Sequence, residues 1–386
     1  MEEISSNKPP SHIEMVLDPS TIITQARRDL NAVVVSGKKQ SRSLSLSSIL
    51  TKIHAGYFRI GISLCSQALL WKTLGEPTSQ PNSLQRLLCM VPTAVTIFLW
   101  FLALLALLLL SLLYLLRCFY YFKMVKAEFL HHVGINYFFA PWISWLLLLQ
   151  SAPFITPSTV YYHILWWVFV LPVIVLDVKI YGQWFTKGKR FLSDVANPTS
   201  LLSVMGNLAG AQAAAQMGWK ECAMFMFSLG ISHYLVLFVT LYQRLSGTDH
   251  RLPTMLRPVF FQFFAAPSMA SLAWDSIAGN FDISSKMLFF LSLFLFTSLV
   301  SRPTLFKKAM KRFNVAWWAY SYPLTMLALA AAEYAQEVNG SIARGLAYVL
   351  SGLSVLVSLA LIVSTALNSS MLLPDKDPIL SHPTNR

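Results

Sequence analysis

Ten apolar stretches, each about as long as a membrane span, alternate with short polar connections between about residues 53 and 371. A helix needs about 20 apolar residues to cross the hydrocarbon core of a bilayer. The pattern therefore predicts ten transmembrane helices, at about 53–71, 90–116, 135–152, 160–178, 199–216, 221–243, 255–274, 284–301, 313–332 and 343–371. An even number of spans places both ends of the chain on the same side of the membrane.

Lysine and arginine concentrate in alternate connections. The connections after the second, fourth, sixth and eighth spans together hold fifteen: Arg117, Lys123, Lys126, Lys179, Lys187, Lys189, Arg190, Arg244, Arg251, Arg257, Arg302, Lys307, Lys308, Lys311 and Arg312. The other five connections hold Lys72, Arg86, Lys220, Lys286 and Arg344. Because basic loops are retained in the cytoplasm, we expect both termini to be cytoplasmic.

Composition agrees with a membrane protein, since 55% of the residues are hydrophobic and only 12% are charged. The net charge of +13 is dispersed over short loops beside the spans, so it does not indicate nucleic-acid binding. The first 50 residues are polar and lack the apolar core of a signal peptide. We expect a cytoplasmic N-terminal tail over 1–51, a transmembrane domain over 52–371 and a cytoplasmic C-terminal tail over 372–386.

The odd-numbered spans differ in composition from the even-numbered ones. Odd spans carry glycine, serine, asparagine, glutamine and proline residues, whereas the even spans are more hydrophobic and rich in leucine and phenylalanine. Polar atoms are costly in hydrocarbon, and small residues allow helices to approach closely. We therefore expect five hairpins, with the odd helices in an inner ring around a narrow path and the even helices outside. A packed bundle without a pore is the alternative.

Several long motifs occur in order along the membrane region: AGYFRIGISLCSQALLW from Ala55, NYFFAPW from Asn136, KIYGQW from Lys179, ANPTSLLSVMGNLAGA from Ala196, HYLVLFVTLYQRL from His233, AAPSMASLAW from Ala265 and FNVAWWAYSYPLT from Phe313. Over about residues 52–371 the chain resembles the plant slow-type (S-type) anion channels. These channels lie within the wider tellurite-resistance/dicarboxylate-transporter family. Within the plant family it resembles the short-tailed homologues.

The resemblance implies an all-α polytopic membrane protein with ten helices in five hairpins and one pore per subunit. It also implies a homotrimer in the plasma membrane that passes chloride and nitrate and uses no cofactor. The family's pore gate corresponds to Phe313, its second pore phenylalanine to Phe138, and its pore glycine to Gly56. Phe139 is the alternative to Phe138 if the register slips by one. A family serine is replaced here by Ala319.

Further site residues follow from the polar groups of the spans and loops. Ser63, Ser66, Asn207 and Ser268 are candidate pore-lining donors, although a hydrogen bond to a neighbouring helix is the ordinary role of such groups. Lys307, Lys308, Lys311 and Arg312 are candidates for an inner mouth that concentrates anions. The alternative is that these four residues only set the topology.

Regulation is expected to come from outside the spans. No arginine-rich repeat resembles a voltage sensor, so we expect weak voltage dependence. Ser45 in the segment RSLS follows Arg42 and is a candidate site for a protein kinase, unless this serine-rich stretch is a chance match. Because the tail is short, mixed trimers with longer-tailed homologues are a further hypothesis.

Two other classes of function are alternatives to an anion channel. A proton-coupled carrier for dicarboxylates or sulfite needs an ionisable group within the spans, and we place Asp177, Asp275 and Glu333 near span ends. An enzyme is disfavoured because the eight histidines show no HExxH spacing and no phosphate-binding glycine loop is present. The four cysteines lack CxxC spacing, and no metal site is expected.

Overall fold

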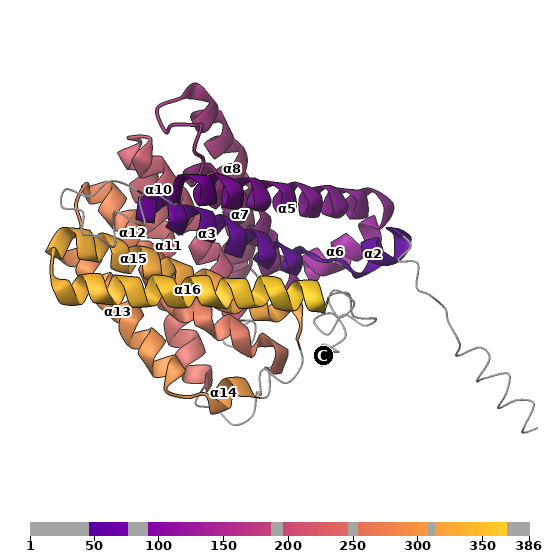
Figure 1. Ribbon diagram of the computed structural model, residues 1–386. Helices are drawn as coiled ribbons and strands as arrows, with labels where there is room; N and C mark the ends of the chain where they lie inside the picture. The colour runs from indigo at the N-terminus through magenta and orange to yellow at the C-terminus, as the bar shows by residue number, and fades with distance from the viewer. Residues whose placement is uncertain (1–45, 76–91, 187–195, 246–253, 308–312, 369–386) are drawn as a thin grey trace, which may run out of the picture. The chain divides into compact units, whose positions relative to one another are not determined.

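The computed structural model describes residues 46–75, 92–186, 196–245, 254–307 and 313–368 (Figure 1). The chain divides into two compact units, residues 1–48 and 49–386. Apart from the first residues of α2 (Leu46–Lys52), every described helix belongs to the second unit.

In the described ranges ten longer helices form five hairpins, and each hairpin pairs a helix of an inner layer with a helix of an outer layer. The pairs are α3 (Phe58–Gly75) with α5 (Pro92–Tyr120), α7 (Phe139–Gln150) with α8 (Val160–Thr186), α10 (Leu201–Gln216) with α11 (Lys220–Leu245), α12 (Gln262–Ala278) with α13 (Ile283–Val300), and α15 (Ser321–Val338) with α16 (Ser341–Leu367). These helices correspond one to one with the ten predicted spans. Two shorter helices, α6 (Phe122–Leu130) and α14 (Thr304–Lys307), lie in connections.

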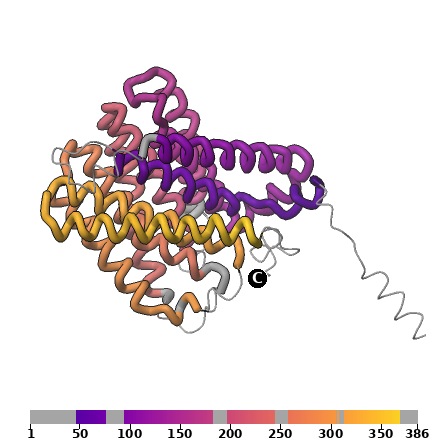
Figure 2. Tube along the Cα trace, in the orientation of Figure 1, coloured from indigo at the N-terminus to yellow at the C-terminus, as the bar shows by residue number. Residues whose placement is uncertain are grey.

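The first helix of each hairpin belongs to an inner ring that closes on itself. α3 packs on α7, α7 on α10, α10 on α12, α12 on α15, and α15 again on α3. The second helix of each hairpin packs on its own partner and on the next inner helix around the ring. The five hairpins can be followed in colour order along the trace in Figure 2. The predicted all-α fold with odd helices inside and even helices outside is confirmed.

Burial separates the two layers as the composition predicted. In α10, every residue from Leu201 to Ala214 is buried, and small residues allow this close packing. The outer helices instead expose large apolar side chains, such as Leu105 of α5 and Leu356 of α16. By length and composition, five described helices can cross a membrane: α5, α8, α11, α13 and α16. The number is six if α6 and the segment Gly134–Gln150, bent by 111°, count as one span.

Every inner helix is preceded by a short 3₁₀ segment. These are η1 (Ala55–Tyr57), η2 (Gly134–Phe138), η3 (Pro198–Ser200), η4 (Thr254–Phe261) and η6 (Val315–Tyr320). A 3₁₀ helix rises about 2.0 Å per residue, so the five residues of η2 add about 10 Å to about 18 Å of α7. The sum approaches the hydrocarbon thickness of about 30 Å, which the twelve residues of α7 do not span alone.

Side-chain caps begin three of these segments. Asn197 accepts a hydrogen bond from the backbone of Thr199, and Asn314 accepts one from the backbone of Ala316. His54 accepts one from Gly56 through Nδ1. Such caps satisfy backbone N–H groups that have no partner within the helix. Consecutive 3₁₀ segments contact one another from η1 to η6, and η6 contacts α3. They form a second closed ring at the N-terminal ends of the inner helices, here called the 3₁₀ ring.

Candidate permeation site

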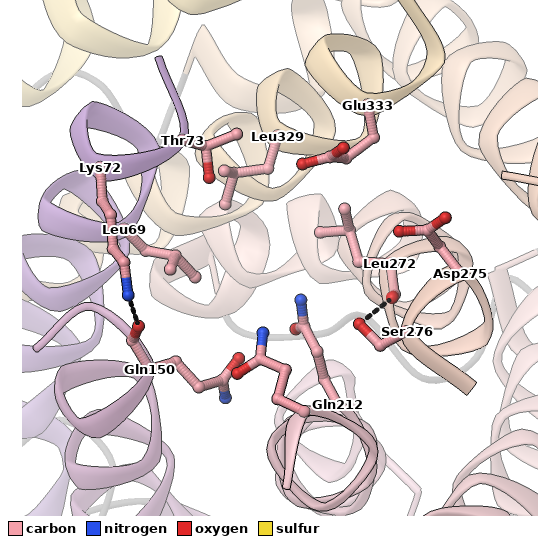
Figure 3. Close-up of a pocket in the computed structure, with 11 residues that line it drawn as sticks. Leu69, Lys72, Thr73, Gln150, Gln212, Leu272, Asp275, Ser276, Leu329 and Glu333 are labelled. Atoms are coloured by element: carbon pink, nitrogen blue, oxygen red, sulfur yellow. Dashed lines mark hydrogen bonds between the residues drawn. The ribbon is translucent and has the colours of Figure 1, made fainter. Parts of the chain in front are cut away.

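A cavity of about 170 Å³ lies among the C-terminal ends of the inner helices. All five inner helices contribute to its wall, which places it at the centre of the ring (Figure 3). Its lining residues are Leu69, Lys72, Thr73, Gln150, Gln212, Gln216, Leu272, Asp275, Ser276, Leu329 and Glu333. Under the predicted topology these helix ends would face the outside, and the cavity is called the vestibule below.

The vestibule is lined mainly by polar and charged groups. Lys72 of α3 donates a hydrogen bond to the carbonyl oxygen of Gln150 at 2.8 Å. Gln150 and Gln212 are buried, and the side-chain Oε1 of each accepts no hydrogen bond within the described part of the chain. Figure 3 shows the side chains of Gln150 and Gln212 between the cavity and the helices that carry them. Unsatisfied buried oxygens of this kind require water or a ligand.

Two acidic side chains also border this vestibule. Asp275 of α12 and Glu333 of α15 lie on its wall, with their carboxylates turned toward it in Figure 3. The sequence prediction placed both near span ends, and they do lie in the last two turns of their helices. Asp177 differs from that prediction, because it is buried within α8 and accepts a hydrogen bond from Asn207 at 2.6 Å.

Phe313 lies directly before the Asn314 cap of η6, beside the 3₁₀ ring. Its ring is half-buried, packs on the hydrophobic core and meets the ring of Trp317 edge-on at 5.5 Å between centroids. The next tryptophan, Trp318, is held from two sides. Its carbonyl oxygen accepts from Ser63 of α3, and its indole donates to Thr365 of α16.

The three aromatic residues of the NYFF motif point in different directions. Phe138 is half-buried and contacts Tyr114 of α5 and Phe129 of α6. Tyr137 is turned toward η1, where its ring would lie 3.7 Å from a Cβ atom at Gly56. Phe139 is fully buried and faces Gly206 of α10. The contacts of Phe138 are therefore with an outer helix and a connecting helix, and its gating role stays a prediction.

Gly56 occupies a position in η1 where a Cβ atom would collide with the imidazole of His54 as it is placed. A Cβ atom there would lie 2.5 Å from Cε1 of His54, closer than non-bonded carbon atoms approach. The neighbouring Ala55 donates its backbone N–H to Oε1 of Glu128 at 2.7 Å. The close approach of the His54 imidazole thus explains the glycine, and its position in the 3₁₀ ring is compatible with the predicted pore role.

The four polar candidates use their hydrogen bonds within the bundle. Ser63 donates to Trp318, and Ser66 donates to the carbonyl oxygen of Ser63 in its own helix. Ser268 bonds Ser292 of α13 at 2.5 Å, and Asn207 donates to Asp177 of α8. A hydroxyl has one proton to donate, so these contacts favour helix-to-helix roles. Pore lining by these residues stays a prediction that the contacts do not support.

Of the predicted inner-mouth bases, the structure describes Lys307, which is exposed at the end of α14. Lys308, Lys311 and Arg312 lie outside the described residues, as does the candidate phosphorylation site Ser45. Within the described ranges, no group of three or more histidine, cysteine, aspartate or glutamate side chains is placed to hold a metal ion.

Sequence reasoning missed a charged residue inside the first span. Arg59 lies in the first turn of α3 and is 5% exposed. Its guanidinium donates to the hydroxyl of Tyr137 and lies 4.4 Å from the centre of that ring. An arginine within an apolar span is itself a signal of function, and the motif AGYFRIG contains it. Arg59 lies within the first predicted span and therefore not in any of the connections.

Comparison with known proteins agrees with this architecture. Residues 52–366 match the model of the SLAC1 family, described as voltage-dependent anion channels. The chain is 56% identical over 350 residues to S-type anion channel SLAH1 of Arabidopsis thaliana, covering 91% of this chain and 90% of the relative.

Two further Arabidopsis relatives show how far the similarity extends. Identity to S-type anion channel SLAH4 is 53% over 365 residues, with 95% of each chain covered. Identity to the guard cell S-type anion channel SLAC1 is 43% over 322 residues, covering 83% of this chain but 56% of the relative. The family consists of channels rather than enzymes, which confirms the prediction that this chain is not an enzyme. The match across the whole membrane region places this chain in the SLAC1 family of voltage-dependent anion channels.

Proposed function

We propose that this chain is a slow, weakly voltage-dependent anion channel of the plasma membrane that passes chloride and nitrate. The observation that carries the proposal is the closed ring of five inner helices with a polar cavity at its centre. An axial vestibule lined by every inner helix is what a single conduit through the subunit requires. The S-type anion channels to which the chain is similar support the same reading.

The gate in this proposal is the ring of Phe313. An aromatic side chain in a narrow apolar path blocks hydrated ions sterically and by dewetting. Phe313 suits this role because it precedes the Asn314 cap, where the chain is not yet helical. Rotation of a half-buried ring against Trp317 changes the path without moving the inner helices. Phe138 is the second candidate, acting from η2.

The charges at the two mouths act in opposite directions on an anion. Lys307, Lys308, Lys311 and Arg312 are proposed to raise the local anion concentration at the cytoplasmic mouth. At the vestibule Asp275 and Glu333 oppose anions, whereas Lys72 attracts them. We propose that this balance allows fast passage of small monovalent anions without tight binding.

The subunit is proposed to assemble as a homotrimer in the membrane with both termini cytoplasmic. Its outer helices expose apolar side chains that suit contact with lipid and with neighbouring subunits. Mixed trimers with longer-tailed homologues and phosphorylation of Ser45 by a protein kinase are proposed routes of activation. A phosphate at Ser45 would place about two negative charges beside the basic residue Arg42.

A proton-coupled carrier of dicarboxylates or sulfite is the second candidate. The observation in its favour is that Asp275 and Glu333 line the vestibule and Asp177 is buried inside α8. Titratable groups within the bundle are the usual means of coupling an anion to a proton.

Voltage-clamp recording from cells expressing the protein separates the two functions. For a channel, the reversal potential follows the chloride or nitrate gradient and does not shift with the proton gradient. A reversal potential that moves with external pH at fixed anion gradients would establish the carrier instead. Currents recorded with chloride, nitrate and malate measure the selectivity. Expression together with a longer-tailed homologue tests whether the subunit needs a partner.

A further inference from the structure

Arg59 is a buried cation with no acidic partner among the described residues. Arg59 as a whole is 5% exposed, and its guanidinium contacts the hydroxyl and the ring face of Tyr137. Its Nε is buried and donates no hydrogen bond within the described part of the chain. A cation–π contact attracts the charge but does not neutralise it. The arginine therefore retains a full positive charge and an open donor inside the bundle.

A second buried arginine in this fold, by contrast, has a carboxylate as counter-ion. Arg117 near the end of α5 is 1% exposed, and Glu128 lies 3.5 Å from it as a counter-ion. A buried charge is tolerated when it is paired and is strongly unfavourable when its partner is missing. Arg59 lacks the carboxylate that Arg117 has, so its counter-charge must come from a group that is not part of the described chain.

The position of Arg59 indicates what that group is. Arg59 and Tyr137 join the first turn of α3 to η2, within the 3₁₀ ring at the N-terminal ends of the inner helices. Tyr137 also borders Gly56. α3 belongs to the inner ring that surrounds the proposed conduit, from which a small ion would approach Arg59. A carboxylate fixed beside Arg59 would cancel the attraction for anions, and none is present among the described residues.

We propose that Arg59, positioned by Tyr137, forms an intramembrane binding site for a small monovalent anion such as chloride or nitrate. The anion accepts a hydrogen bond from Nε of Arg59 and supplies the counter-charge of the guanidinium. The inference rests on the proposed channel function, because the inner ring is the route by which the anion arrives. It assigns to α3 a specific anion contact that the hydroxyl-bearing candidates do not provide.

The test measures the melting temperature of the purified full-length protein in detergent by tryptophan fluorescence. Sodium chloride or sodium nitrate replaces sodium gluconate at constant ionic strength. The wild-type protein is expected to show a saturable rise in melting temperature, because an anion that binds the folded state stabilises it. Arg59→Gln is expected to lose that rise. Arg302→Gln, which removes an exposed arginine, serves as the matched control and should keep the rise.

The gluconate baseline gives a second, independent readout. Without a small anion the guanidinium of the wild type is uncompensated, so Arg59→Gln should melt at the same temperature as the wild type or higher. A structural role for Arg59 predicts the opposite, a loss of stability of equal size in every salt. That result, or an unchanged anion-dependent rise in Arg59→Gln, overturns the proposal.

Two further variants keep the test decisive if the glutamine protein does not fold. Arg59→Lys retains the charge and is expected to keep the rise at a higher half-saturating anion concentration. Tyr137→Phe removes the hydroxyl but keeps the ring, and should also keep the rise. An unchanged half-saturating anion concentration in Arg59→Lys would refute the site. The melting-temperature test detects anion binding without measuring current. If the protein binds anions through Arg59 but carries no current, the binding site is supported and only the channel proposal is contradicted.

Discussion

The carboxylate of Glu128 in α6 accepts the backbone N–H of Ala55 at 2.7 Å and lies 3.5 Å from the guanidinium of Arg117. It thereby joins the first 3₁₀ segment to the end of α5. Both charged side chains are almost completely buried. Their pairing fixes the position of η1, which carries Gly56, relative to the first outer helix.

Replacing Glu128 by alanine should therefore be strongly destabilising. It leaves the charge of Arg117 uncompensated and the N–H of Ala55 unsatisfied, and breaking a buried pair costs about 3–5 kcal/mol. Chemical denaturation in detergent measures the loss. The double variant Arg117→Met with Glu128→Leu should recover the part of this loss that comes from the unpaired charge of Arg117. Glu221→Gln at the exposed start of α11 is the control, and an equally small effect of both single changes would argue against a structural ion pair.

Phe313→Ala should produce a large constitutive anion current. Removing the ring widens and wets the proposed constriction, which no longer needs to be opened. Steady-state current under voltage clamp, normalised to surface expression, measures the change. Trp317→Phe preserves an aromatic contact for Phe313 and should leave the channel closed. An unchanged current in Phe313→Ala at normal surface levels would remove Phe313 as the gate.

Neutralising the acids of the vestibule should increase anion conductance. A unit charge about 10 Å away in water contributes about 0.4 kcal/mol, so Glu333→Gln or Asp275→Asn should raise the conductance by roughly twofold. The gain should shrink as ionic strength rises, because salt screens the charge. Single-channel recording at two salt concentrations measures both effects. Glu337→Gln changes a nearby acid that does not line the vestibule and serves as the control.

Gly134 and Gly345 should respond oppositely to alanine. A Cβ atom at Gly134 would lie 2.4 Å from the carbonyl oxygen of Glu128, so Gly134→Ala forces the backbone apart. Overpacking of this kind costs about 1–3 kcal/mol or more. Gly345 of α16 has no atom within 4 Å of that position, and alanine there should stabilise the helix by about 0.5–1 kcal/mol. Thermal unfolding of the two variants measures the contrast.

Asp282 caps α13 in the connection before it, outside the spans. Partial desolvation alone would raise the pKa of Asp282, but hydrogen bonds from the Ser285 backbone and the Trp274 indole outweigh it and hold the pKa below its ordinary value. The ionised cap therefore stabilises the fold above about pH 4, and this contribution is lost as the pH falls below that value.

Two substitutions separate the cap from the charge. Asp282→Ala should cost about 1 kcal/mol at neutral pH. Asp282→Asn keeps an oxygen acceptor and should stay near wild-type stability while losing the acid-dependent change. Melting temperatures recorded between pH 3 and pH 7 distinguish these expectations, and identical acid profiles for wild type and Asp282→Asn would contradict them.

The spans and their layers followed from the sequence because both depend on composition summed over many residues. The predicted span 199–216 corresponds to η3 and α10, and its serines, glycines and alanines are buried as expected. The alternation of spans rich in polar residues with more hydrophobic spans indicates which helices are surrounded by protein. A membrane enforces this difference strongly, since exposed polar groups are costly there.

The partners of individual side chains did not follow from the sequence. Asn207 was expected to line the pore but donates a hydrogen bond to Asp177 of α8. An inner helix such as α10 packs on several other helices, so the sequence does not show which of them a polar side chain contacts. The direction of Phe138 depends on the 3₁₀ geometry of η2, in which the angle between successive side chains differs from that of an α-helix. The vestibule residues Gln150 and Gln212 lie far apart in sequence and meet only through the ring closure.

The tight turns that begin each inner helix also give the bundle a means of changing length. A residue advances about 2.0 Å in a 3₁₀ helix and about 1.5 Å in an α-helix, so rewinding the six residues of η6 would shorten that segment by about 3 Å. The same rewinding would rotate whatever precedes it about the helix axis. Phe313 stands immediately upstream of η6. A local change of winding in η6 would therefore translate and rotate the benzyl group of Phe313, while α15 keeps its packing against the neighbouring helices.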